Sequence, residues 1–279
     1  MTRIIDSHCH IYPEKIAQKA VDAVEEFYGG LPRKPWGGTA SELLRVGAEA
    51  GISHYVVFSV ATSPRQVSSI NRFIAQSVSE SGGTMTGLGT MHPDSDDFAR
   101  DLSEIEALGL KGVKLHPDIQ HFEADDPRAF EIYRLCEERG LPVCIHAGDS
   151  RYDYSNPERL SRILESFPRL RMIAAHLGGW SVWENATERL ARYPNLMVDT
   201  SSSIYWLGVD TTRRLIRMYG SERVLFGTDY PLWPQRPEID DLLAMGLENE
   251  EYENIFWRNA VKLYGLCPDR DETEETKHA

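Results

Sequence analysis

The stretch Ile4-Ile5-Asp6-Ser7-His8-Cys9-His10 begins with β-branched apolar residues and ends in carboxylate, hydroxyl and imidazole side chains. β-Branched residues favour extended structure, so the stretch predicts a strand over Arg3–His8. Residues two apart on an extended chain face the same side, so His8 and His10 point the same way. The sequence therefore predicts a strand whose carboxyl end presents two neighbouring imidazoles.

The same change from apolar to polar recurs along the chain. Further strands are expected at His54–Val60, Thr84–Met91, Gly112–His116, Pro142–His146, Leu170–His176, Asn195–Asp199 and Arg223–Asp229. Helical segments are expected at Glu14–Phe27, Thr39–Ala50, Pro64–Glu80, Asp96–Leu108, Asp126–Arg139, Pro157–Phe167, Trp180–Arg192, Asp210–Tyr219, Pro237–Met245 and Asn249–Tyr264. Strands that alternate with helices are parallel and joined by crossovers. Eight such units favour a single (β/α)₈ TIM barrel of the α/β class over an open doubly wound sheet.

One domain is expected over residues 1–268, followed by a polar tail at 269–279 with no assigned role. The Gly/Pro-rich segment Gly29–Thr39 predicts an irregular loop after the first strand, which could cover the barrel mouth as a lid. The segment Asn249–Tyr264 predicts a C-terminal helix that closes the chain.

Composition excludes several classes of protein. The formal net charge is −13, which argues against nucleic-acid and anionic-membrane partners because both need a basic surface. No apolar run approaches a membrane span, and Asp6 interrupts any signal peptide at the start. Four cysteines without a C-x-x-C pair predict free thiols in a reducing cytoplasm.

The strand ends carry the candidate chemistry, because active residues of a parallel barrel lie at the carboxyl ends of its strands. The residues there that could bind metal or transfer protons are Asp6, His8, His10, His116, His146, His176 and Asp229. Any one of these could be a hydrogen-bonded core residue. The whole set is expensive to bury unless its members have partners, so together they favour a metal site.

The segments IIDSHCHIYPEKI, GVKLHP, GLPVCIHAGD, AAHLGG and VLFGTDYP, in this order, resemble the amidohydrolase-related branch of the amidohydrolase superfamily. This branch contains aminocarboxymuconate-semialdehyde decarboxylase and related decarboxylases, hydratases and lactonases. The closing NIFWRNAVKLYGL is similar to the family's terminal helix, so the resemblance extends from about Arg3 to Leu266. It implies a metal-dependent hydrolase or lyase that acts on a small substrate.

The resemblance also implies roles for single residues. His8, His10, His146 and Asp229 match the metal ligands, and Asp229 and His176 match the catalytic groups that handle the metal-bound water. Such a set suits one Zn²⁺ ion with an open position, and Mn²⁺ or Fe²⁺ is also compatible. In some branches a carboxylated lysine at the position of Lys114 bridges two metals. In the favoured branch Lys114 is structural or faces the substrate.

The loops after the strands suggest a pocket for a carboxylate-bearing substrate, with Lys114 or Arg151 as its anchor. The expected substrate-binding residues are Lys114, His116, Arg151, Tyr152, Trp180 and Tyr205. The pocket is aromatic-lined if these rings face it rather than pack the loops. A small aromatic or unsaturated acid is the expected substrate.

Four functions remain open at this point. Metal-activated water could hydrolyse an ester, lactone or amide, or the same groups could decarboxylate an aromatic or unsaturated acid. A metal-free lactonase would use the polar groups to bind substrate directly. A metal-dependent DNase begins with a similar strand, but such enzymes usually place Glu where this chain has Lys114. A homodimer is expected only by analogy with relatives.

Overall fold

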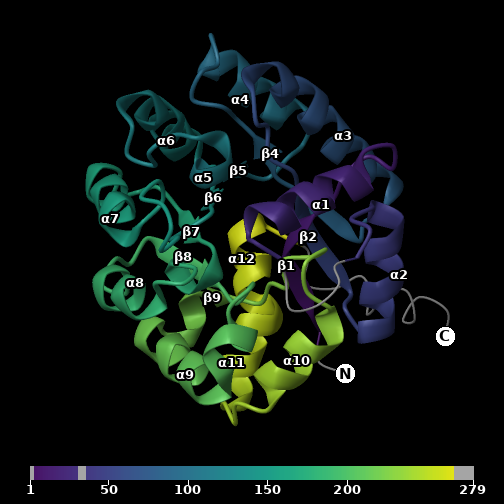
Figure 1. Cartoon of the computed structure of the whole chain (residues 1–279), viewed down its shortest axis with the longest axis vertical. Coiled ribbons are helices and arrows are strands. Elements are labelled where there is room, and N and C mark those ends of the chain that lie inside the picture. Colours follow the sequence, from purple (N-terminus) through teal and green to yellow (C-terminus); the bar gives the residue numbers. More distant parts are fainter. Residues whose placement is uncertain (1–2, 31–35, 267–279) are drawn as a thin grey trace, which may run out of the picture.

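The strands form a closed ring of parallel β-structure in the computed structural model, which describes residues 3–30 and 36–266 (Figure 1). They are β1 (Ile5–His10), β2 (His54–Phe58), β3 (Met85–Gly87), β4 (Gly89–Thr90), β5 (Val113–Leu115), β6 (Val143–Ile145), β7 (Met172–Ala174), β8 (Leu196–Asp199) and β9 (Val224–Leu225). Neighbouring strands pair in parallel within each of two runs, from β1 to β3 and from β4 to β9. The predicted barrel is confirmed.

Two places complete the ring. The N–H of Leu88, between β3 and β4, donates to the carbonyl of Val57 at 2.9 Å, so β3 and β4 are two parts of the predicted third barrel strand. On the other side, the N–H of Ser7 donates to the carbonyl of Phe226 at 2.8 Å, and Cys9 pairs in parallel with Tyr230. The eighth strand therefore meets the first, and the sheet closes on itself.

Helices surround the strands, as Figure 1 shows. They are α1 (Ala17–Phe27), α2 (Ala40–Ala50), α3 (Val67–Glu80), α4 (Phe98–Ala107), α5 (Pro117–Gln120), α6 (Pro127–Arg139), α7 (Pro157–Ser166), α8 (Trp183–Leu190), α9 (Ile204–Tyr219), α10 (Gln235–Leu243), α11 (Asn249–Glu253) and α12 (Asn259–Tyr264), with a π-helical turn at Asn254–Arg258 between the last two. The short helix α5 was not predicted. The expected helix from Asp210 begins earlier, at Ile204, and Gly208 interrupts it with φ 71°.

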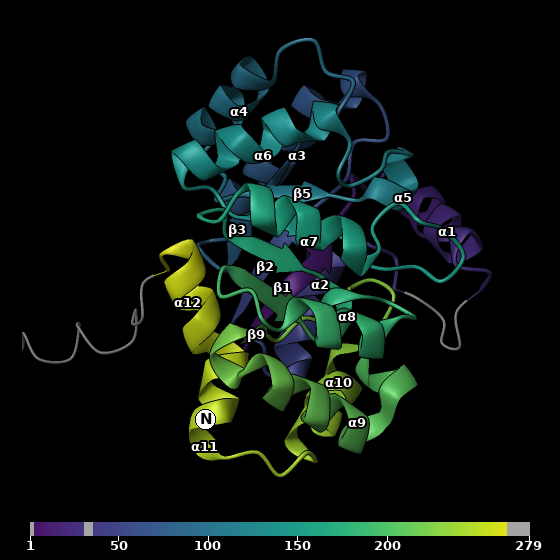
Figure 2. The same ribbon diagram turned by 90° about the vertical axis from the view of Figure 1, so that its left-hand side faces the viewer.

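The interior of the barrel is apolar at one end and polar at the other. At the apolar end, side chains of the strands pack against the inner face of α12. The residues of this cluster are Ile5, Val56, Phe58, Leu88, Cys144, Ile173, Leu225, Ala260, Leu263 and Tyr264. Figure 2 shows α12 at one end of the barrel and α1 with α5 at the opposite end. Because α5 follows β5 directly, α1 and α5 mark the carboxyl ends of the strands, where active sites of such barrels lie.

Some sequence predictions fall outside the described residues. The centre of the predicted loop Gly29–Thr39, the tail at 269–279 and Cys267 are among them. The other cysteines, Cys9, Cys136 and Cys144, are buried free thiols. Within residues 3–30 and 36–266, the helices are too short or too polar to cross a membrane.

Candidate active site

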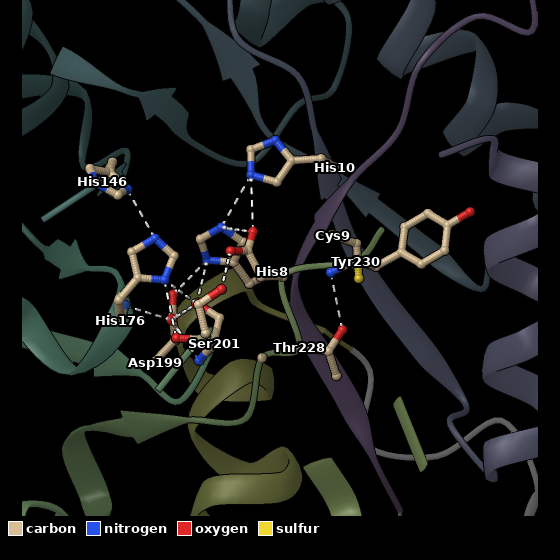
Figure 3. A network of polar contacts seen from close by, with 12 residues as sticks. His8, Cys9, His10, His146, His176, Asp199, Ser201, Thr228 and Tyr230 are labelled. Atoms are coloured by element: carbon tan, nitrogen blue, oxygen red, sulfur yellow. Dashed lines mark hydrogen bonds and ion pairs between the residues drawn. The ribbon is translucent and has the colours of Figure 1, made fainter. Parts of the chain in front are cut away.

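Three side chains converge where β1 ends and in the segment after β9, as predicted. Figure 3 labels two of them, His8 and His10. Nε2 of His8 lies 3.3 Å from Nε2 of His10 and 3.3 Å from Oδ1 of Asp229, and Nε2 of His10 lies 3.5 Å from the same oxygen. Tetrahedral ligands bound to zinc at about 2.0–2.1 Å stand about 3.4 Å apart. The three ligand atoms therefore have the spacing that a divalent metal ion needs.

A buried carboxylate orients His8. Oδ2 of Asp199, at the end of β8, lies 2.9 Å from Nδ1 of His8. A carboxylate only accepts, so Nδ1 donates and the lone pair of Nε2 faces His10 and Asp229. This arrangement is typical of histidine ligands of metals. Sequence reasoning missed Asp199, although its position at a strand end was a signal.

The imidazoles of the group are neutral. Burial, strengthened by the positive charge of Lys114, holds the pKa of His8 and of His10 well below the usual range for histidine. Burial likewise lowers the pKa of His176 to about 4. Histidine binds metal in its neutral form, so burial keeps these rings in the form that binds a metal ion.

Asp229 is held so that one oxygen stays available. Its N–H donates to the carbonyl of His8 at 2.9 Å, and its φ of 65° turns the residue out of the strand. The hydroxyl of Ser202 donates to Oδ2 at 2.5 Å, and the indole of Trp233 donates to the Ser202 oxygen at 2.7 Å. Oδ1 therefore faces the two imidazoles while Oδ2 is occupied.

The other candidate histidines form a row beside this group. Nε2 of His176 lies 3.0 Å from Nδ1 of His146, and the ring of His146 stacks on that of His116 with centroids 3.9 Å apart. His146 thus contacts His176 and is not among the three converging ligand atoms. Its role as a metal ligand stays a prediction. His176 lies between His146 and His8, whose ring centroid is 5.1 Å away.

Lys114 reaches the ligand group from β5. Its fully buried side chain brings Nζ to 3.3 Å from Nε2 of His8 and to 3.7 Å from Sγ of Cys144. The same Nζ lies 4.7 Å from the centre of the Phe58 ring. Lys114 therefore brings a positive charge next to the candidate metal position.

A cavity of about 570 Å³ opens from this group. Lys114, His116, His176, His10 and Asp229 line its inner end. Trp180 instead lines a second cavity of about 110 Å³, which shares His176 and Asp229 with the first. The site therefore faces two cavities, and only some of the predicted substrate contacts lie in the larger one.

Arg151 and its aromatic neighbours lie at the mouth. The guanidinium of Arg151 pairs with the buried Asp149 at 2.7 Å and donates to the carbonyl of Phe27 at 2.6 Å. It also stacks near Trp180 and Tyr152, and Tyr152 is 43% exposed. These contacts join the loop after β6 to α1, so Arg151 links two segments that border the mouth.

Tyr205 is 42% exposed, and its ring contacts that of Trp206 edge-on and lies tilted against that of Trp233. Neither described cavity has Tyr205 in its lining. Its predicted contact with substrate therefore stays a prediction.

Two buried carboxylates stand apart from the ligand group. Asp6, a candidate from the sequence, accepts from the N–H and the hydroxyl of Thr228 at 3.0 and 2.6 Å, and burial raises its pKa to about 6. Asp6 therefore joins β1 to the segment after β9. Sequence reasoning missed Asp118, which lies 3.9 Å from His146 and whose pKa burial also raises to about 6.

The family model for amidohydrolases matches residues 5–266. The chain belongs to the amidohydrolase family. It is an enzyme of the amidohydrolase-related branch, which its strand-end segments resemble. It is 24% identical to 2-amino-3-carboxymuconate-6-semialdehyde decarboxylase of Dictyostelium discoideum, over 72% of this chain and 67% of that protein.

Solved structures share the fold at lower identity. An uncharacterised TIM-barrel protein of Bordetella bronchiseptica has a TM-score of 0.78 and 23% identity, covering 95% of this chain and 99% of that one. A manganese-bound dihydroxybenzoic acid decarboxylase of Polaromonas has a TM-score of 0.71 and 18% identity, covering 95% and 98%. A 2,6-dihydroxybenzoate decarboxylase of Rhizobium has a TM-score of 0.70 and 19% identity, covering 95% and 99%.

Proposed function

We propose that this amidohydrolase-family enzyme is a metal-dependent decarboxylase of a carboxylic acid. The observation that carries the proposal is the opening of the group His8, His10 and Asp229 onto a cavity whose inner end also holds Lys114. A carboxylate that enters this cavity meets the positive charge of Lys114 beside the candidate metal position. This placement would hold the carboxylate, which is the group that leaves in decarboxylation, beside the candidate metal position.

The relatives support decarboxylation over hydrolysis. The Dictyostelium relative is named as a decarboxylase, and so are the Polaromonas and Rhizobium proteins with the same fold. The sequence alone predicts a metal-dependent hydrolase or lyase, with decarboxylation as an alternative. The relatives, together with the cavity that Lys114 lines, make decarboxylation the better proposal.

His8, His10 and Asp229 would hold the ion, and His146 is proposed as a further ligand. A bound divalent ion supplies Lewis-acid attraction for oxygen atoms of the substrate. Zinc fits the ligand spacing, and manganese, which is bound in the Polaromonas protein, is an alternative. We propose one ion per chain, with Lys114 uncarboxylated.

At the substrate, the reaction then consists of one bond cleavage and one proton transfer. The bond between the ring or chain carbon and the carboxylate carbon breaks, carbon dioxide leaves, and the electron pair stays on the remaining carbon. That carbon needs one proton, which the carboxyl group of Asp229 would deliver. Water would then return a proton to Asp229, and the hydroxide that remains would leave with carbon dioxide as bicarbonate. His176, which is neutral, would orient the substrate by hydrogen bonding, and Lys114 and His116 would bind its polar groups.

The test is release of carbon dioxide by the full-length protein loaded with Zn²⁺ or Mn²⁺ and supplied with hydroxybenzoates and unsaturated acids. We expect release that a chelator stops, and a loss of at least a hundredfold in Asp229→Asn. Asp210→Asn, an exposed acid on α9, is the matched control and should keep the wild-type rate. Hydrolysis of a lactone or ester without release of carbon dioxide from any acid would disprove the proposal.

The same assay separates the other readings. A metal-free lactonase would cleave lactones at an unchanged rate in chelator. A DNase would cut DNA, and we propose against it because Lys114 stands on β5 beside the ligand group. We also propose a reducing cytoplasm as the site of action, on the evidence of the free thiols.

A further inference from the structure

The larger cavity is divided into a polar floor and an apolar wall. The floor is the inner end already described, where Lys114 and Asp229 lie. The wall is mainly apolar, with side chains from α1, from the residue just before it and from α3, namely Ile16, Ala20, Val24, Phe27, Ile70 and Phe73. Because the two parts differ in chemistry, they select different ends of one ligand.

Helix α1 has an apolar face that packing against the barrel does not fully bury. Ala20, Val24 and Phe27 are spaced for one side of the helix, yet each is only half-buried, and Val21 is one of the few fully buried residues of α1. In the described part of the chain, α1 makes no extensive contact with any other helix or strand. Its apolar side therefore borders the cavity instead of the core.

Helix α3 supplies the facing wall. Ile70 and Phe73 are three residues apart on one side of α3, both half-buried, and both line the cavity together with residues of α1. Apolar surface in contact with water is unfavourable. A ligand with apolar surface between α1 and α3 would remove that cost on both sides.

The volume exceeds what a single ring fills. An acid with one ring has roughly ten heavy atoms, and at interior packing density each takes roughly 20 Å³. Such an acid fills well under half of the cavity of about 570 Å³. Charge on the remaining part of the ligand would be placed against the apolar wall, which is costly.

We propose that the substrate is an acid with its carboxylate at the polar floor and a second ring or a comparable apolar group between α1 and α3. This inference rests on the proposed function for the chemistry and on the cavity wall for the substrate class. It separates this enzyme from one built for a compact dicarboxylate or a single polar ring.

The test is calorimetric titration of the Zn²⁺-loaded full-length protein with salicylate, with phthalate and with 3-phenylsalicylate, an acid that carries a second ring. We expect 3-phenylsalicylate to bind at least tenfold more tightly than either other acid. Equal affinities, or a preference for phthalate, would overturn the inference.

A variant locates the second ring. Ala20→Trp places a large side chain on the wall, and it should reduce the affinity for 3-phenylsalicylate at least tenfold while that for salicylate changes less than twofold. Ala48→Trp, on the exposed side of α2, is the matched control and should change neither. An equal loss for both acids in Ala20→Trp would contradict the placement.

Carbon dioxide release, measured on the same samples, keeps the two proposals apart. A preference for the two-ring acid in binding without release of carbon dioxide from any acid supports the cavity inference and disproves decarboxylation. Release of carbon dioxide from single-ring acids, without tighter binding of the two-ring acid, supports decarboxylation and disproves the cavity inference.

Discussion

The carboxylate of Asp199 organises the site through hydrogen bonds. Its oxygens accept from Nδ1 of His8, from the N–H of His176 at 3.0 Å and from the N–H of Ser201 at 3.2 Å. These bonds fix the ring of His8 and the start of the segment after β7. Asp199 is therefore a positioning residue that acts through His8.

Asp199→Asn should weaken Zn²⁺ binding about 10- to 100-fold, because loss of the charged acceptor frees the tautomer and the orientation of His8. Competition with a chromogenic chelator measures this affinity directly. Asp210→Asn removes an exposed carboxylate elsewhere and should leave the affinity unchanged. Unaltered Zn²⁺ affinity in Asp199→Asn would show that Asp199 does not orient a ligand.

Residue-level prediction from the sequence succeeded where a local pattern carried the signal. The pair His8 and His10 and the carboxylate Asp229 were predicted, and the structure brings them together. Asp199 was missed because its place at a strand end, the one local signal, does not by itself show that a carboxylate orients a histidine. Its role arises from contact with His8, which lies 191 positions away along the chain.

At the scale of elements, α1 is attached to the barrel through its C-terminal end. Arg151 donates to the carbonyl of Phe27, and the hydroxyl of Tyr28, just after the helix, lies 3.2 Å from Nε2 of His116. The ring of Tyr28 also contacts Trp180, with centroids 5.0 Å apart. In the described part of the chain, α1 makes no extensive contact with another helix or strand, so these contacts help to decide how firmly it covers the cavity.

Arg151→Ala should raise the rate of amide hydrogen exchange in α1 about tenfold, since it removes the bond to Phe27 and the stacking on its ring. The exchange of β5 and β6 should stay as in the wild type. Arg162→Ala, which removes an exposed arginine of α7, is the control. Equal protection of α1 in Arg151→Ala and the wild type would refute the attachment.

The elements themselves were largely predictable, because strands and most helices have local patterns. Helix α5 was missed because four residues show no helical periodicity. The start of α9 was missed because Gly208 interrupts its pattern. The cavity wall on α1 could not be predicted, since an apolar helix face usually packs on the core and only the fold shows that this one does not.

For the whole molecule, buried neutral histidines predict sensitivity to acid. His54, whose Nε2 lies 2.9 Å from the hydroxyl of Thr86, is distant from the metal group, and burial lowers its pKa to about 4. The pKa of His54 is lower in the folded state than in the unfolded state. At pH values between the two pKa values, the unfolded state therefore binds more protons. The contribution of His54 to the free energy of unfolding is therefore fully present above about pH 6.5 and is lost as the pH falls toward 4.

His54→Gln should remove this part of the acid sensitivity. Between pH 6.5 and 5, the free energy of unfolding of the wild type should fall by on the order of 1–2 kcal/mol more than that of the variant. Urea titration at both pH values measures the difference. Parallel losses in the two proteins would show that His54 does not titrate as the burial implies.

The central claim is that His8, His10 and Asp229 hold a catalytic metal ion, and elemental analysis of the purified full-length protein tests it most directly. The account predicts about one Zn or Mn per chain, lost in His8→Ala and retained in the control His54→Gln. A protein that contains no metal after purification and after incubation with Zn²⁺ or Mn²⁺, or that keeps its ion in His8→Ala, would contradict it.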